Sequence, residues 1–137
     1  MAIGWNDSTG ATGSVEASVQ NPFLEDADIV VLENTLVQDR KSYGSCFLSG
    51  QVRNDGNYTG WNIMVTFTAY GDGDVILDTA SGFPANLGDI PPGVSAVFEA
   101  IFFDVKRWKN IKKYTWKTEW LTRDGSHREN EGTVNIQ

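Results

Sequence analysis

One stretch of strict alternation limits the possible folds of this chain more than any other feature. From position 61 to position 70, apolar residues alternate with mainly polar ones, which is the period-two pattern of a strand that buries one face. A second alternating segment, residues 45–54, precedes it along the chain. The residues between the two segments are rich in Asn, Asp and Gly, which favour tight turns. The two segments therefore predict an antiparallel hairpin.

Short alternating segments separated by turn residues continue through the rest of the chain. We expect strands at residues 28–38, 45–54, 60–70, 75–79, 94–104, 114–122 and 131–136. The segment 83–93 holds three prolines and is expected to be a loop, because proline cannot join a central ladder. The pattern contains no amphipathic helix of useful length. Seven short strands in about 110 residues predict an all-β fold, an immunoglobulin-like antiparallel β-sandwich.

The first 27 residues differ in composition from the rest. They are rich in Gly, Ser, Thr and Asn and show no sustained period, which is typical of a flexible linker. Both a native tether and a remnant of cloning or processing fit this composition. We therefore expect a flexible N-terminal linker at residues 1–27 and the immunoglobulin-like β-sandwich domain at residues 28–137.

The apolar faces of the expected strands predict the core of the domain. The hairpin supplies aliphatic and aromatic side chains, and two later strands add further aromatic rings. The predicted core residues are Leu48, Val52, Trp61, Ile63, Val65, Phe67, Phe98 and Trp116. Cys46, the only cysteine, also falls on an apolar face, so we expect it to be a small buried residue.

The charge of the chain narrows the range of partners. The formal net charge is −7, with 11 basic and 18 acidic residues. Nucleic acids and anionic membranes attract basic surfaces, so no nucleic acid is expected as a partner. No apolar run approaches the roughly 20 residues that cross a bilayer. The first residues also lack the charged start and apolar core of a signal peptide. We therefore expect no direct membrane insertion of these residues.

The strongest candidate for a binding site is the basic segment 105–113, which places five cations and one Trp on an otherwise acidic chain. An aromatic ring among cations suits an anionic polymer, a lipid headgroup or an acidic protein. The alternative is a solvated loop in which the Trp folds back onto the domain as a plug. The candidate binding residues are Lys106, Arg107, Trp108, Lys109, Lys112 and Lys113.

Signatures of catalysis and of metal binding are weak in this sequence. It has one Cys and one His, and it shows no nucleophile elbow, phosphate loop or metal-ligand spacing. Asp72, Asp74 and Asp78 offer oxygen ligands for Ca²⁺, but the EF-hand pattern is absent and Asp-Gly is ordinary hairpin chemistry. We therefore predict a protein that is not an enzyme and that has no catalytic residues, metal or cofactor.

The residues of the hairpin also resemble a known family. The segments 49–56 and 61–70 are similar to the strand, Asn-Gly turn and strand of FxLYD-type domains. The signature itself is Phe67-Thr68-Ala69-Tyr70-Gly71 here, with Ala in place of Leu and Gly in place of Asp. CARDB-like adhesion modules share the turn and the alternating strand. The resemblance implies a module of the cell exterior or envelope that is usually non-catalytic and often follows a lipid or membrane anchor.

These observations predict a non-enzymatic extracellular or cell-envelope module for protein interaction or spacing, with any signal or anchor outside the present residues. The partner would be an unknown protein or a cell-surface polymer, and free edge strands allow a homo-oligomer. The alternative is a carbohydrate-binding module that uses exposed Trp residues. Exposure of Trp108, Trp116 and Trp120 distinguishes the two functions, although the shared face of Trp116 and Trp120 favours burial in the core.

Overall fold

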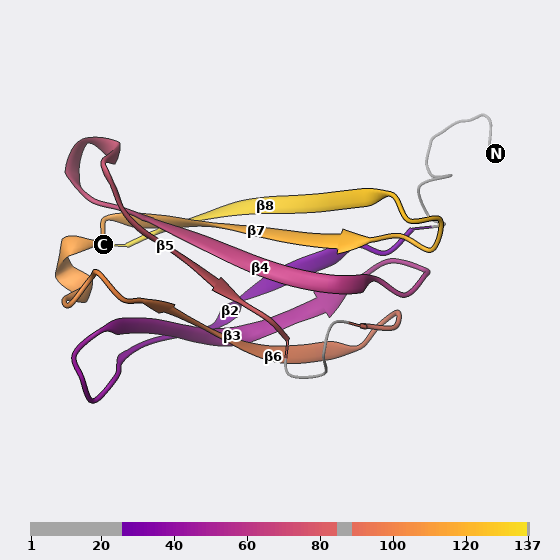
Figure 1. The fold of residues 1–137 in the computed structure, drawn as a ribbon, viewed down its shortest axis with the longest axis horizontal. Helices are drawn as coiled ribbons and strands as arrows, with labels where there is room; N and C mark the ends of the chain where they lie inside the picture. Colours follow the sequence, from indigo (N-terminus) through magenta and orange to yellow (C-terminus); the bar gives the residue numbers. More distant parts are fainter. Residues whose placement is uncertain (1–25, 85–88, 137) are drawn as a thin grey trace.

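The computed structural model describes residues 26–84 and 89–136, which form an antiparallel β-sandwich (Figure 1). A three-stranded sheet in the order β2-β3-β6 packs on a four-stranded sheet in the order β5-β4-β7-β8. The predicted fold class, all-β and immunoglobulin-like, is therefore confirmed. The seven strands of the described ranges are β2 (Ile29–Arg40), β3 (Cys46–Asn54), β4 (Trp61–Tyr70), β5 (Ile76–Gly82), β6 (Ser95–Phe102), β7 (Lys113–Leu121) and β8 (His127–Asn135). The predicted hairpin is wrong, because β3 and β4 belong to different sheets and the turn between them crosses from one sheet to the other.

The strand β8 shows the largest difference from the expected boundaries. It begins at His127, whereas the alternation predicts a strand only from position 131. All nine residues pair with β7, from Leu121 opposite His127 to Lys113 opposite Asn135. Charged residues have weak strand propensity, but pairing with a long neighbouring strand supplies the ladder that their own sequence does not favour. No helix within the described residues is long and apolar enough to cross a membrane.

The core lies between the two sheets and consists mainly of side chains from alternate strand positions. Phe67 stacks on Phe98 across the sandwich, with ring centroids 5.5 Å apart, and meets Tyr114 edge to face at 5.9 Å. Such offset and edge-to-face pairs are the favoured arrangements of buried aromatic rings. Seven of the predicted core residues are buried: Leu48, Val52, Ile63, Val65, Phe67, Phe98 and Trp116.

Trp61 is the exception among the predicted core residues, because it is only half-buried. The backbone explains this difference. Asn62 has a positive φ of 54°, and the pairing of β4 with β7 shifts register between Trp61 and Met64. This irregularity interrupts the alternation at the start of the strand. The core side of β4 therefore begins at Ile63, which is 1% exposed.

Asn54 fixes the turn that follows β3. Its side chain is fully buried and forms four hydrogen bonds. The Oδ1 atom accepts from the backbone N–H of Asp28 at 3.0 Å and of Gly56 at 2.8 Å. The Nδ2 atom donates to the carbonyl oxygens of Tyr58 at 2.7 Å and Ile90 at 2.9 Å. One side chain thus joins the start of β2, the turn before β4 and the loop before β6.

The start of the domain lies slightly before the predicted boundary at residue 28. Ala27 is buried in the core, and the Asp26 carboxylate accepts a hydrogen bond of 3.0 Å from Nε of Arg128 on β8. Two residues assigned to the linker therefore pack on the domain, because the backbone before β2 continues to pair with the turn after β3: the N–H of Asn57 donates to the carbonyl oxygen of Asp26 at 3.0 Å. The remainder of the predicted linker, residues 1–25, lies outside the described residues.

Candidate functional site

The basic segment does not form one cationic surface. The ammonium group of Lys106 donates to Oγ of Ser45 at 2.9 Å and to the carbonyl oxygen of Phe103 at 2.8 Å. Lys112 donates to the carbonyl oxygen of Lys109 at 3.3 Å. Two of the predicted binding cations are therefore held by nearby protein oxygens and help to order the loop between β6 and β7.

Trp108 folds back onto the domain and is not a free platform for a ligand. Its ring meets Phe102 at 6.2 Å and Tyr114 at 6.3 Å, edge to face in both cases. Its Nε1–H donates to the carbonyl oxygen of Asp39 at 2.7 Å. The indole, in the short 3-10 turn η3 (Trp108–Asn110), therefore packs against the buried rings at this end of the sandwich.

The remaining cations of the segment point in different directions. Lys113 belongs to β7, where its ammonium group lies 3.0 Å from Oδ1 of Asp74 and 5.1 Å from the centre of the Tyr70 ring. Arg107 is exposed and lines a shallow hollow of about 250 Å³ beside Lys106. Lys109 is exposed on η3. The six predicted residues are therefore close in sequence but do not share one surface: Lys106 and Arg107 line the hollow, Trp108 packs on the core, and Lys113 lies on the four-stranded sheet.

The aspartates considered for Ca²⁺ are separated in the same way. Asp74 pairs with Lys113, and Asp78 accepts hydrogen bonds from the backbone N–H groups of Thr79 at 2.7 Å and Asp104 at 3.0 Å. Within the described residues, no group of three or more His, Cys, Asp or Glu side chains is placed to hold a metal ion.

The two Trp residues of β7 face the core. Trp116 and Trp120 are 6% and 3% exposed. The Nε1–H of Trp116 donates to the Glu33 carboxylate at 2.7 Å, and its indole occupies the space that a side chain at Gly132 would fill. Trp108, Trp116 and Trp120 therefore offer no flat exposed surface to a sugar.

Two other surfaces have the composition of binding sites. The first is an apolar face on the outside of the three-stranded sheet, formed by Val37, Tyr43, Phe47, Val97, Ile101 and Phe103. Val37, Tyr43, Val97 and Phe103 are between 54% and 60% exposed. The rings of Tyr43 and Phe103 stack at 6.5 Å. The ammonium group of Lys41 lies over this face, 4.3 Å from the centre of the Phe47 ring and 2.9 Å from the carboxylate of Glu99.

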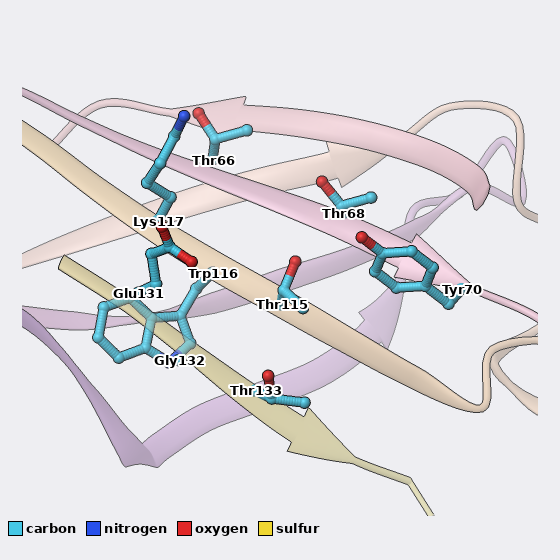
Figure 2. A pocket seen from close by; sticks show the side chains of 9 residues that line it. All are labelled: Thr66, Thr68, Tyr70, Thr115, Trp116, Lys117, Glu131, Gly132 and Thr133. Carbon is cyan, nitrogen blue, oxygen red and sulfur yellow. The ribbon is translucent and has the colours of Figure 1, made fainter. Parts of the chain in front are cut away.

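The second surface is a shallow groove on the outside of the four-stranded sheet, with a volume of about 550 Å³. We call it the hydroxyl groove. Figure 2 shows its threonine and lysine side chains on one side of the strands, with the indole of Trp116 directed away from them. The lining residues come from β4, β7 and β8: Thr66, Thr68, Tyr70, Thr115, Trp116, Lys117, Glu131, Gly132 and Thr133.

Strand register brings four threonines into one row across this sheet. Thr79 pairs with Thr68, Thr68 with Thr115, and Thr115 with Thr133. Neighbouring strands lie about 4.8 Å apart, so the row is about 14 Å long. The rows on either side contain Thr66 opposite Lys117 and Tyr70 opposite Lys113.

Sequence reasoning identified the polar face of residues 61–70 but did not propose it as a site. The available signal was the outward Thr-x-Thr-x-Tyr pattern of β4 together with Thr115 and Lys117 on β7. That signal indicates exposure and hydroxyl content. It does not indicate which threonine lies beside which, because pairing joins strands far apart in the chain.

Comparisons with known proteins do not assign the chain to a family. No family model matches it, and no curated protein matches it. Among solved structures, the chain is similar to the GAE domain of yeast GGA1, with 18% identity, a TM-score of 0.47, and coverage of 86% of this chain and 95% of that one. It is also similar to the archaellum periplasmic stator protein FlaG of Sulfolobus acidocaldarius, with 10% identity, a TM-score of 0.40, and coverage of 77% and 99%.

A third similar structure is DesR, a β-glucosidase from Streptomyces venezuelae, with 14% identity and a TM-score of 0.40. The match covers 81% of this chain and only 15% of the glucosidase. With TM-scores below 0.5, these likenesses carry no argument about function.

Proposed function

We propose that this chain is a non-catalytic interaction module of the cell exterior or envelope, and that its apolar face binds another protein. The observation that carries the proposal is the exposure of Val37, Tyr43, Val97 and Phe103 on one sheet face. Single exposed apolar residues are ordinary in soluble proteins, whereas a group of them on one face is typical of an interaction site.

The composition of the apolar face fits a protein partner. One end of the face carries stacked aromatic rings, Tyr43 on Phe103, and aromatic side chains often dominate the binding energy of protein interfaces. The ion pair of Lys41 and Glu99 lies within the face, since Glu99 stands between Val97 and Ile101 on β6, and it offers a partner polar contacts among the apolar ones. A pure spacer would gain nothing from keeping four large apolar side chains in water.

The resemblance to FxLYD-type domains supports the cellular setting. The Asn-Gly turn that carries the resemblance has a clear structural role, since Asn54 holds three segments together. Gly50, another residue of the pattern, lies beneath Leu36 of β2, whose side chain would be 2.8 Å from an added Cβ. Asn54 and Gly50 therefore have structural roles that a related domain would also need. The location outside the cell is what the resemblance adds to the proposal.

Site-specific photocrosslinking in cells of the source organism tests the proposal. A photoreactive amino acid is introduced at Val97 or Phe103, and the matched control position is Ile76, which is equally exposed on the other sheet. We expect one discrete protein adduct from Val97 and Phe103 and none from Ile76. An adduct with a second copy of the chain would identify the partner as the chain itself. Equal labelling from all three positions, or no adduct from Val97 and Phe103, would refute the proposal.

A further inference from the structure

We propose that the hydroxyl groove binds a neutral polysaccharide, with the sugar chain lying across β4, β7 and β8. This site is separate from the apolar face, because the outer surfaces of the two sheets lie on opposite sides of the sandwich. The proposal therefore adds a second binding activity to the protein interaction proposed above. Exposed Trp residues play no part in it.

The first argument is the hydrogen-bonding capacity of the groove. A threonine hydroxyl can donate one hydrogen bond and accept two, as each hydroxyl of a sugar can. Some threonine hydroxyls elsewhere in the fold are used internally: Thr118 donates to the carbonyl oxygen of Ile29 at 2.6 Å, and Thr35 to that of Leu32 at 2.6 Å. Within the described residues, the groove hydroxyls of Thr68, Thr115 and Thr133 have no such protein partner. They are therefore available to a ligand or to water.

The second argument is the length of the row. The threonines at positions 68, 115 and 133 line the groove, and Thr79 on the neighbouring β5 extends their row to about 14 Å, at intervals of about 4.8 Å. A row of that length spans more than one sugar ring, so it suits a chain better than a monosaccharide. The volume of about 550 Å³ also lies within the range of known small-molecule sites.

The third argument is charge. The lining contains one cation and one anion, Lys117 and Glu131, which lie opposite each other in the β7–β8 pair. The ammonium group of Lys117 is also 3.7 Å from a Glu119 oxygen and 3.6 Å from a Glu129 oxygen. These neighbouring carboxylates, on a chain of net charge −7, would repel an anionic polymer. A neutral ligand avoids this repulsion and can still bond to both charged groups.

The fourth argument is the aromatic ring at one end of the groove. Tyr70 is half-buried, and Lys113 is placed near its ring by the ion pair with Asp74. Figure 2 shows the Tyr70 hydroxyl on the same side of the sheet as the threonine hydroxyls. A ring with a polar tip can contact the C–H face of a sugar while its hydroxyl bonds to a neighbouring group. Tyr70 would thus hold one end of the polysaccharide chain.

Native affinity electrophoresis of the full chain tests the proposal with defined polymers. The neutral probes are hydroxyethyl cellulose, galactomannan, soluble starch and dextran, and the charged probes are polygalacturonate and chitosan. The test variant is Thr68→Val/Thr115→Val, which removes two groove hydroxyls and keeps β-branched side chains. The matched control is Ser95→Ala, which removes one exposed strand hydroxyl from the other sheet.

We expect at least one neutral polymer to retard the protein, with affinity at least tenfold weaker for the double variant and unchanged for Ser95→Ala. No retardation by any neutral polymer, retardation by charged polymers alone, or an unaffected double variant would overturn the proposal. If the double variant does not fold, the binding site is located in the unmodified protein by NMR. Amide chemical shifts are followed while the protein is titrated with the retarding polymer or an oligosaccharide of it. Shifts grouped on β4, β7 and β8 support the groove, and shifts elsewhere refute it.

Discussion

Replacement of Asn54 by Ala should destabilise the domain more than the loss of any exposed polar side chain. The substitution removes the four side-chain hydrogen bonds of a residue that is 0% exposed. Two backbone N–H groups and two carbonyl oxygens then lose a partner. A buried N–H or carbonyl group without a partner still bears the cost of its removal from water. Water that enters the gap, or another hydrogen bond to the same group, would recover part of the lost stability.

The expected magnitude follows from these four bonds. A typical internal hydrogen bond contributes about 0.5–1.5 kcal/mol net, so four give about 2–6 kcal/mol, with a central value of about 4 kcal/mol. A domain of about 110 residues has a free energy of unfolding of about 5–15 kcal/mol. The substitution should therefore remove a large fraction of the total. With about 4 °C per kcal/mol for a domain of this size, the Tm should fall by about 15 °C.

Urea unfolding followed by far-UV circular dichroism measures the effect. The midpoint should fall by about 2 M at an m-value of about 2 kcal/mol/M, with the m-value itself unchanged. The matched control is Asn57→Ala in the same turn, where the side chain is exposed and the backbone N–H keeps its bond to Asp26. The control should change stability by at most about 0.5 kcal/mol. A loss below about 1 kcal/mol for Asn54→Ala would refute the assignment of Asn54 as the residue that fixes this end of the sandwich.

Three further predictions concern other parts of the fold. Gly132→Ala should lower the free energy of unfolding by about 1–3 kcal/mol and alter Trp fluorescence, because the added Cβ would overlap the Trp116 indole; an unchanged urea midpoint would contradict this. Hydrogen bonds from Thr122 and Ser126 lower the pKa of Asp124 to about 2, so its contribution to stability is present above about pH 4 and is lost as the pH falls towards 2. In Asp124→Asn, the urea midpoint should therefore depend less on pH between pH 4 and pH 2 than it does in the unmodified protein. An identical pH dependence in the two proteins would contradict this role of Asp124. Burial raises the pKa of the Cys46 thiol, so this thiol should react with a disulfide reagent only when the protein unfolds. Rapid labelling of the native protein at pH 8 would contradict the burial of Cys46.

Short-range pattern predicted most of the fold because a strand needs only local information. Alternation placed Leu48, Val65 and Phe67 in the core, and the Asn-Gly turn placed Asn54 at the end of its strand. The same alternation failed at Trp61, where a positive φ at Asn62 breaks the period. Such an irregularity depends on pairing with β7, about 60 residues later in the chain, so the local pattern could not reveal it.

The candidate sites were less predictable than the fold. Clustering in sequence suggested a common surface for residues 106–113, but the chain bends there and directs Trp108 to the core and Lys113 to the sheet. Conversely, the apolar face combines side chains from β2, β3 and β6 and the loop after β2, which are separated along the chain. Contiguity in sequence was therefore a poor guide to contiguity on the surface.

The sequence by itself determined which side chains of each strand point outwards and what chemistry they carry. Thr68 and Thr115 face away from the core because their neighbours Phe67 and Trp116, which are large and apolar, are buried on the opposite face of the same strand. That these threonines lie side by side with Thr79 and Thr133 follows from strand pairing in the folded domain. A period of two fixes the face of a strand but not its register. Register between distant strands is set by the packing of the buried faces and the lengths of the turns, which are properties of the whole sandwich.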